Sequence, residues 1–324
     1  MAAISGRGED LRGYATYATL MLKGALSLSK TLVTNAGDVV KLRQIRPAEQ
    51  HYVRPAQRYE LPVYEPGMQY CRSSERYLRP TRFCNPWEPE VIALANKLGG
   101  FRVSDYEFAQ AAFEHAKEKM TLEICPLDSV GEALRRGTGT CFHLISVFIA
   151  LCRAAGIKAR YKMYAINMIQ AWQAAVVDVD PLTKKWYDSL GYFVIEGEGE
   201  AYIDGRWVVA HVGPTKERQA AAGIPITRFG EDSLGIWFHA RPGTIMRFES
   251  IPPGLGGGSR TLHRIAPGSM ERINVSIQKQ IQLGREIIAA AGGPEAYDRR
   301  VREAAGPSLP KVEMKARQEI TFTE

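Results

Sequence analysis

The residue that could most directly carry chemistry is Cys141, which follows the segment Gly137-Thr-Gly-Thr140 and begins a stretch that ends at Gly156. Thr140 is of a type that caps helix N-termini, and the stretch after it is apolar on nearly every side, which predicts a helix buried in the core. Backbone N–H groups and the helix dipole at such an N-terminus stabilise a thiolate and lower the thiol pKa. We therefore expect a nucleophilic thiol at the start of a central helix.

A second group of reactive side chains lies on a predicted hairpin, whose arms cover residues 196–203 and 206–212. Asp204-Gly205 between the arms is a strong signal for a two-residue turn. With such a turn, Glu198 lies opposite His211, and their Cβ atoms are about 5 Å apart. We therefore expect a carboxylate and an imidazole to face each other, an arrangement that raises the histidine pKa.

Acidic residues alternate with glycine in the first arm of this hairpin, in the run Glu196-Gly-Glu-Gly-Glu200. Because successive side chains of a strand point to opposite faces, Glu196, Glu198 and Glu200 share one face with Tyr202. The glycines leave the other face open to close packing. Like charges on one patch raise the pKa values of its carboxyl groups. The pattern favours a functional patch over an exposed polar face.

Three segments of the chain resemble the transglutaminase-like superfamily. They are Gly139-Thr-Cys141, Leu151-Cys-Arg-Ala-Ala-Gly-Ile-Lys-Ala-Arg-Tyr161 and Glu200-Ala-Tyr-Ile-Asp-Gly-Arg-Trp207, and the resemblance covers roughly residues 88–235. It implies an α+β, papain-like core in which the cysteine helix packs on an antiparallel sheet, with Cys141 as the nucleophile. The family's catalytic histidine falls on Glu196, its tryptophan on Glu198 and its aspartate on His211.

Because two members of the family's triad are replaced, three functional hypotheses remain open. In the first, the chain is an enzyme of thiol-dependent acyl or amide chemistry, by hydrolysis or transfer, on a small-molecule or peptide substrate. His211 would activate Cys141, and a glutamate, Glu196 or Glu198, would orient His211. This hypothesis requires no cofactor.

The second hypothesis is a lyase or isomerase that acts on a small molecule with the Glu196/Glu198/Glu200/His211 patch. Carboxyl groups of raised pKa suit proton transfer. Carboxylate and imidazole together also suit Zn, Mn or Fe, so a divalent metal would be held by Glu196, Glu198 and His211. The third hypothesis is a non-catalytic binding module.

Further side chains are assigned secondary roles. Glu200, Tyr202 and His239 are predicted to contact the substrate, the last because it lies in the segment Trp237-Phe-His-Ala-Arg-Pro242. His143 is two residues after Cys141, so it points away from the thiol on a helix and is not the thiol's direct base.

Composition sets outer limits on these hypotheses. The chain has 324 residues, of which 45% are hydrophobic and 24% charged, which excludes collagen, coiled coil and general disorder. The net charge of +7 indicates an acidic partner only weakly. Five cysteines without a CxxC pair argue against a complete disulfide framework and favour a reducing cytoplasm. No stretch reaches about 18 uncharged apolar residues, so we expect no membrane span.

We expect three parts: an N-terminal part over 1–87, a transglutaminase-like core over 88–250, and a C-terminal part over 251–324. The first holds a helix over 10–34 and an arm rich in Pro, Tyr and Arg, which we expect to lie over the body; no compact nucleic-acid motif accompanies it, so no nucleic-acid partner is expected. The third holds a Gly-rich loop at 254–258, helices over 271–291 and 295–305, and a tail. Other predicted elements are helices at 90–98, 106–120 and 128–136 and strands at 158–166, 174–179 and 192–196.

Overall fold

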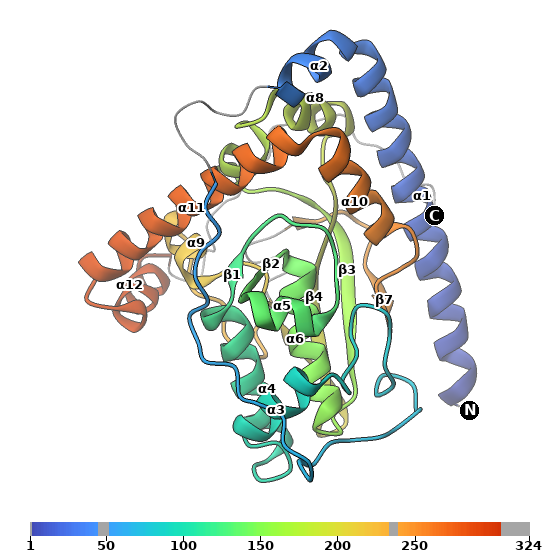
Figure 1. Ribbon diagram of the computed structural model, residues 1–324, viewed down its shortest axis with the longest axis vertical. Coiled ribbons are helices and arrows are strands. Elements are labelled where there is room, and N and C mark those ends of the chain that lie inside the picture. Colours follow the sequence, from blue (N-terminus) through green and yellow to red (C-terminus); the bar gives the residue numbers. More distant parts are fainter. Residues whose placement is uncertain (1, 45–51, 233–238, 306–324) are drawn as a thin grey trace.

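An antiparallel sheet forms the centre of the molecule (Figure 1). The computed structural model of the chain describes residues 2–44, 52–232 and 239–305. Within them, β4 (Phe193–Ile203) pairs with β5 (Arg206–Ala210) on one side and with β3 (Ala159–Asn167) on the other. The short strands β6 (His239–Ala240) and β7 (Met246–Phe248) both pair with β3. The predicted α+β class is confirmed.

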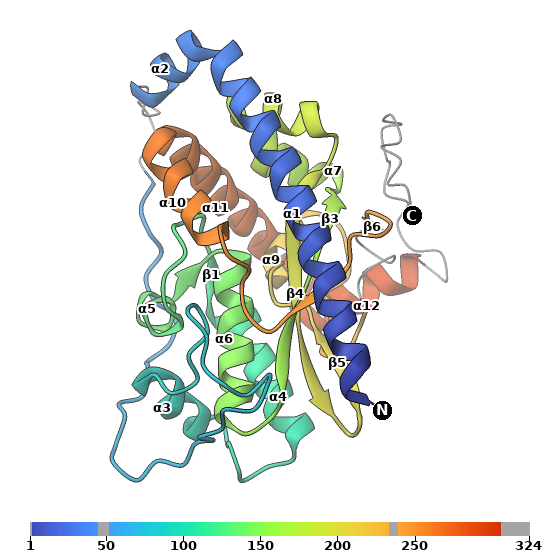
Figure 2. The same ribbon diagram turned by 90° about the vertical axis from the view of Figure 1, so that its right-hand side faces the viewer.

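The helix α6 (Cys141–Ala154) packs on this sheet, and every residue of it after Cys141 is buried, as the apolar sequence predicts. Its contact with β4 depends on glycine, because a Cβ at Gly199 would lie 2.6 Å from the Phe148 ring. Gly156, with φ of +85°, follows the helix end in the left-handed region that glycine adopts readily. In Figure 2 the sheet lies between α6 and the N-terminal helix.

The hairpin has the predicted turn and register. Asp204 and Gly205 have φ values of 48° and 78°, and Ile203 pairs with Arg206. The ladder ends at the pair Gly199–Ala210, so His211 follows the last pair and is not itself paired with Glu198. In the ladder with β3, Glu198 instead faces Lys162.

Helices on the far side of α6 complete the core. They are α3 (Pro89–Lys97), α4 (Asp105–Glu114) and α5 (Val130–Arg136). Ser104 caps α4 as predicted, but the helix predicted to reach residue 120 widens into a π-helical turn, η1 (His115–Lys119), which buries Lys117. The two-residue strands β1 (Thr121–Leu122) and β2 (Thr138–Gly139) pair in parallel and lead into α6.

The N-terminal helix α1 (Ala2–Thr34) ends just before Asn35, as predicted, and begins earlier than predicted. A short helix that the sequence did not indicate, α2 (Ala36–Gln44), follows it. From residue 52 to residue 88 the chain lies mostly irregular over the body, as expected for the arm. Arg54 pairs with Glu123 at 3.0 Å, and Gln57 donates to the carbonyl of Leu134 at 2.9 Å. These contacts attach the arm to the body.

Two sequence predictions are wrong in the second half of the chain. The predicted strand at 174–179 is instead a π-helical turn, η2 (Gln173–Val177), between α7 (Gln170–Trp172) and α8 (Pro181–Leu190). The stretch 213–265, expected to be irregular, contains α9 (Lys216–Ala221) and α10 (Leu255–Ile265). The predicted Gly-rich loop is instead the first turn of α10. Gly256 in this turn lies close to the Phe83 ring, which a Cβ would meet at 2.6 Å.

The predicted C-terminal helices are confirmed as α11 (Pro267–Ala290) and α12 (Pro294–Ala305). In Figure 1, α11 crosses above the centre of the molecule, and α9 packs beneath it. A Cβ at Gly284 of α11 would lie 1.8 Å from the Glu217 carbonyl oxygen of α9, so the two helices touch at their backbones. The predicted tail lies outside the described residues, and the three-part division of the chain stays a prediction. None of the described helices is long and apolar enough to cross a membrane.

Candidate active site

Cys141 is partly exposed at the first position of α6, where the sequence places it. Its thiol lies close to the carboxylate of Glu196 and to the backbone N–H of Phe142. Loss of hydration and the charge of Glu196 raise the pKa of the thiol well above its ordinary value, although the Phe142 N–H and Arg218 oppose this. The expected lowering of the thiol pKa is therefore not met, because burial, together with the neighbouring carboxylate, outweighs the effect of the helix N-terminus.

Glu196 is the carboxylate that the fold brings to the thiol. Burial raises its pKa, while the N–H of Gly197, the Cys141 thiol and Arg218 act in the opposite direction. The loop after β5 closes against this pair: a Cβ at Gly213 would lie 3.1 Å from the Cys141 Cβ and 3.6 Å from Glu196 Oε1. The structure therefore places a thiol and a carboxyl group, each of raised pKa, next to each other.

Arg218 is a part of the site that sequence reasoning missed. It lies on α9, is 7% exposed, and its electrostatic partners are Glu196 and Cys141. Burial lowers its pKa to about 10, which those two groups partly offset. Its Nε donates to Gln280 of α11 at 2.9 Å, and its guanidinium lies over the Trp172 ring at 5.0 Å. No spacing in the sequence marks Arg218, because packing between distant helices creates its position.

Tyr164 was also missed. It pairs with Glu196 in the β3–β4 ladder, and its side chain is fully buried. Burial, followed by the charges of Glu198 and Glu196, raises its pKa well above the ordinary value. Within the part of the chain that the structure describes, its hydroxyl has no hydrogen-bond partner. The position of the Tyr164 hydroxyl next to the acidic residues follows from the register between β3 and β4, which the sequence does not give.

Glu198 and His211 lie near the pair but belong to a separate buried group. Glu198 is paired with Lys162 at 2.7 Å; burial raises its pKa to about 7 although Lys162 opposes this. His211 is buried, and burial and the charges of Lys117 and Lys162 hold its pKa well below the ordinary value, opposite to the direction expected from the sequence. The groups with the largest influence on the pKa of the Cys141 thiol are Glu196, Phe142 and Arg218.

Of the three predicted substrate contacts, Glu200 and Tyr202 lie farther along the hairpin, and the side chain of His239 is not described. Glu200 is buried and paired with Arg160 at 2.6 Å. Tyr202 is exposed and packs against Trp207, with ring centroids 5.2 Å apart. The backbone of His239 pairs with Asn167 in the sheet, and its side chain lies outside the described residues. The substrate-binding roles of these three stay predictions.

His143 has a structural place, in agreement with its exclusion as the thiol's base. Its Nδ1 accepts from the N–H of Thr140 at 3.0 Å, and its Nε2 lies 2.9 Å from Asp128. Its Cβ would lie 2.4 Å from a Cβ at Gly139, which explains the glycine before Cys141. Gly139 and Thr140 are therefore needed for packing and hydrogen bonding with His143.

No three His, Cys, Asp or Glu side chains in the described ranges form a group that could hold a metal ion. At the predicted metal patch, the ammonium of Lys162 lies against Glu198, where a cation would have to bind. A divalent metal at Glu196, Glu198 and His211 stays an untested prediction.

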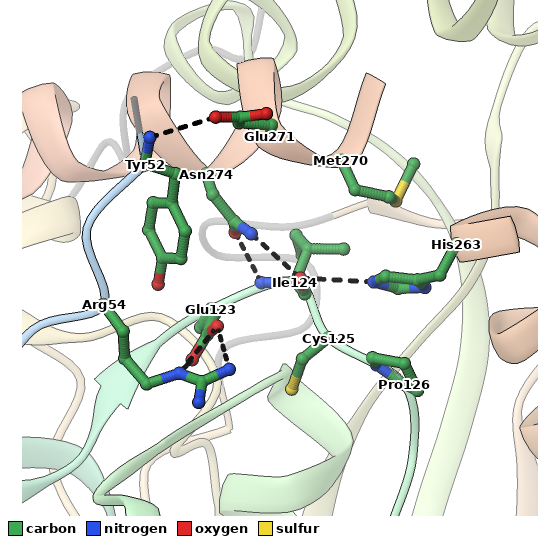
Figure 3. Close-up of a pocket in the computed structure, with 10 residues that line it drawn as sticks. All are labelled: Tyr52, Arg54, Glu123, Ile124, Cys125, Pro126, His263, Met270, Glu271 and Asn274. Carbon is green, nitrogen blue, oxygen red and sulfur yellow. Dashed lines mark hydrogen bonds and ion pairs between the residues drawn. The ribbon is translucent and has the colours of Figure 1, made fainter. Parts of the chain in front are cut away.

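A pocket of about 280 Å³ lies elsewhere, between the arm, the segment after β1, α10 and α11 (Figure 3). Arg54 and Glu123 bind each other at one side, and the Asn274 amide binds both the N–H and the carbonyl of Ile124. None of the predicted site residues lines it. Its polar groups are largely used in holding the arm and α11 to the core.

Comparison with known proteins gives a family match for the central part of the chain. No curated protein matches the sequence. A solved structure, "a Putative Cysteine Protease from Cytophaga hutchinsonii", matches at 21% identity and a TM-score of 0.32, over 49% of each chain, so the match spans about half of that protein. The model of the transglutaminase-like superfamily matches residues 92–211, which include α6 and the hairpin. This central segment, which contains Cys141 and Glu196, is thus similar to the transglutaminase-like superfamily.

Proposed function

We propose that the chain is a thiol-dependent hydrolase or acyltransferase in which Cys141 attacks an ester or amide carbonyl of a small-molecule or peptide substrate. Glu196, rather than His211, is its general base. The observation that carries this proposal is the closeness of the half-buried Glu196 carboxylate to the partly exposed thiol at the start of α6.

The first half of the reaction forms an acyl-enzyme. Glu196 accepts the thiol proton as the sulfur attacks the carbonyl carbon, and the C–S bond forms while the carbonyl electron pair moves to oxygen. When this pair returns, the bond to the leaving group breaks, and protonated Glu196 gives its proton to the leaving oxygen or nitrogen. The raised pKa of Glu196 suits both proton transfers, because it makes the carboxylate a stronger base than an exposed one.

The second half releases the acyl group. Glu196 removes a proton from water or from an acceptor amine, which attacks the thioester carbon, and the sulfur leaves with the returned proton. Water gives hydrolysis and an amine gives transfer. The thiol is protonated at rest in this scheme, because the pKa of Cys141 is raised. Proton transfer and attack are therefore coupled.

The test uses p-nitrophenyl acetate as an activated acyl donor. We expect rapid release of p-nitrophenolate and an acetyl group on Cys141, located by peptide mass spectrometry. Cys141→Ala removes both signals. Cys71→Ala is the matched control, because Cys71 is also a partly exposed free cysteine. The proposal fails if the acetyl group is found elsewhere, or if Cys141→Ala reacts as fast as the unaltered protein.

A further inference from the structure

We infer that Arg218 is a catalytic residue whose guanidinium stabilises the negative charge that forms on the acyl oxygen when Cys141 attacks. This inference rests on the proposed function. The site at rest has one negative charge, on Glu196, and Arg218 is the positive charge that acts on both Glu196 and Cys141. In the reaction that negative charge moves to sulfur and then to oxygen, so a cation coupled to both groups stabilises the charge along its whole path.

The guanidinium of Arg218 is held in place by residues of two other helices, α7 and α11. Gln280 binds Nε, and the Gln280 amide N–H is itself bound to the carbonyl of Ala171 at 3.1 Å. Trp172 lies under the guanidinium, and its indole N–H donates to the Arg218 carbonyl at 3.3 Å. Three elements, α7, α9 and α11, thus hold one side chain in place. A donor fixed before the reaction does not have to reorganise during it.

The terminal amino groups of Arg218 remain available. Among the described residues, they have neither a hydrogen bond nor a carboxylate within ion-pair distance. Arg153 offers a comparison within the same molecule, because it is also buried but only supports the fold. Its Nε, Nη1 and Nη2 all donate to backbone carbonyls, at 2.6 to 3.1 Å. The structural Arg153 donates hydrogen bonds from all three guanidinium nitrogens, whereas Arg218 donates only from Nε.

The discriminating experiment compares two reactions of the same sulfur. Acylation by p-nitrophenyl acetate forms a C–S bond, places negative charge on the carbonyl oxygen and then expels p-nitrophenolate. Alkylation by iodoacetamide forms a C–S bond and expels iodide without an oxyanion. Both rates depend on thiol ionisation, but only acylation needs an oxyanion donor. Their ratio therefore isolates the role that we assign to Arg218.

For Arg218→Met we expect acylation of Cys141 to fall by about 10²–10³-fold, the usual effect of removing one oxyanion donor. Alkylation should change far less, only as thiol ionisation changes. Arg58→Met is the matched control, because Arg58 pairs with Glu217 at the same end of α9 and should leave both rates unchanged. An equal loss in both reactions, or no loss in either, would overturn the inference.

A second variant, Gln280→Leu, guards against failure of Arg218→Met to fold. It keeps the positive charge and removes the partner of Nε. For Gln280→Leu we expect a smaller fall in the acylation rate than for Arg218→Met, and no change in the alkylation rate. The inference is contradicted if Gln280→Leu is acylated at the unaltered rate and Arg218→Met either is also acylated at that rate or does not fold. The unaltered protein is measured first: if Cys141 is alkylated but never acylated, the proposed function fails and the inference fails with it, whereas acylation insensitive to Arg218 rejects only the inference.

Discussion

Two glutamates of β4, Glu196 and Glu200, lie on the same face of one strand and yet have opposite surroundings. Glu200 meets Arg160 at 2.6 Å, and Arg160 in turn lies over the Trp207 ring at 3.8 Å. Glu196 lies beside a thiol and accepts from the N–H of Gly197 at 3.1 Å, and no cation of the described residues lies within ion-pair distance of it. A buried carboxylate paired with a cation supports the fold, whereas a carboxylate left with a weak acid is available to move a proton.

Exchange of each carboxyl group for an amide gives the largest expected contrast. Glu196→Gln should slow acylation of Cys141 by about 10²–10⁴-fold, because general-base catalysis is lost. It should also remove the rise of the acylation rate as pH increases through the pKa of Glu196. The measurement is the p-nitrophenolate release rate over pH. A variant as fast as the unaltered protein would leave Glu196 without a catalytic role.

Glu200→Gln should give the opposite result. The change leaves Arg160 without its main carboxylate partner, and the loss of one member of a buried pair typically costs about 3–5 kcal/mol of unfolding free energy. Urea denaturation measures this loss, and acylation of Cys141 in the folded variant should be unchanged. A slower reaction at full stability would mean that Glu200 takes part in the chemistry, as the sequence alone allowed.

Glu198, between these two, should make stability depend on pH. Its pKa in the folded protein is about 7, above its ordinary value of 4.5, so the folded state binds the proton more tightly than the unfolded state. The stabilisation is present below about pH 4.5 and is lost as pH rises toward 7, by at most about 3 kcal/mol. Denaturation curves across this range should lose that slope in Glu198→Gln; an unchanged slope would assign it to other groups.

The opposite face of the same strand should respond only through packing. Gly199→Ala places a Cβ against Phe148, and overpacking of a core typically costs about 1–3 kcal/mol. Gly257→Ala on α10 is the control, because a Cβ there meets no atom within 4 Å. The unfolding midpoints of the two variants should move in opposite directions. Equal midpoints would mean that α6 can shift away from the sheet.

Metal removal should have the smallest effect. Because Lys162 already neutralises Glu198, we expect dialysis against a chelator to leave both acylation and stability unchanged. Elemental analysis of the purified protein gives the second readout. A bound divalent ion that is lost in Glu198→Gln or His211→Ala would favour the lyase or isomerase hypothesis instead.

The sequence predicts best those features that local rules determine. The buried helix from Cys141 to Gly156 and the Asp204-Gly205 turn are set by apolar pattern and turn chemistry, and both are found. The hairpin register follows from the turn, and the common face of Glu196 and Glu200 follows from the alternation of side chains along a strand. The family resemblance over this segment is confirmed by the match to residues 92–211.

Features set by contacts between distant elements were beyond the sequence. Arg218 becomes part of the site only because α9 packs against α11, and the 213–265 stretch gives little local sign of helix. The strand predicted at 174–179 is η2, where tertiary packing overrides β-branched residues. The direction of the thiol pKa was missed for the same reason, since the opposing charge lies on another element.

The backbone contact between Gly284 and Glu217 has a consequence for how much of the chain the proposed reaction needs. The segment matched by the superfamily stops before Arg218, and the residues that fix this arginine lie on α7 and α11. A chain cut back to residues 92–211 would keep Cys141, Glu196 and Trp172 but lose Arg218 itself, together with its partner Gln280. The C-terminal helices therefore define the shortest version of this protein in which catalysis should be sought.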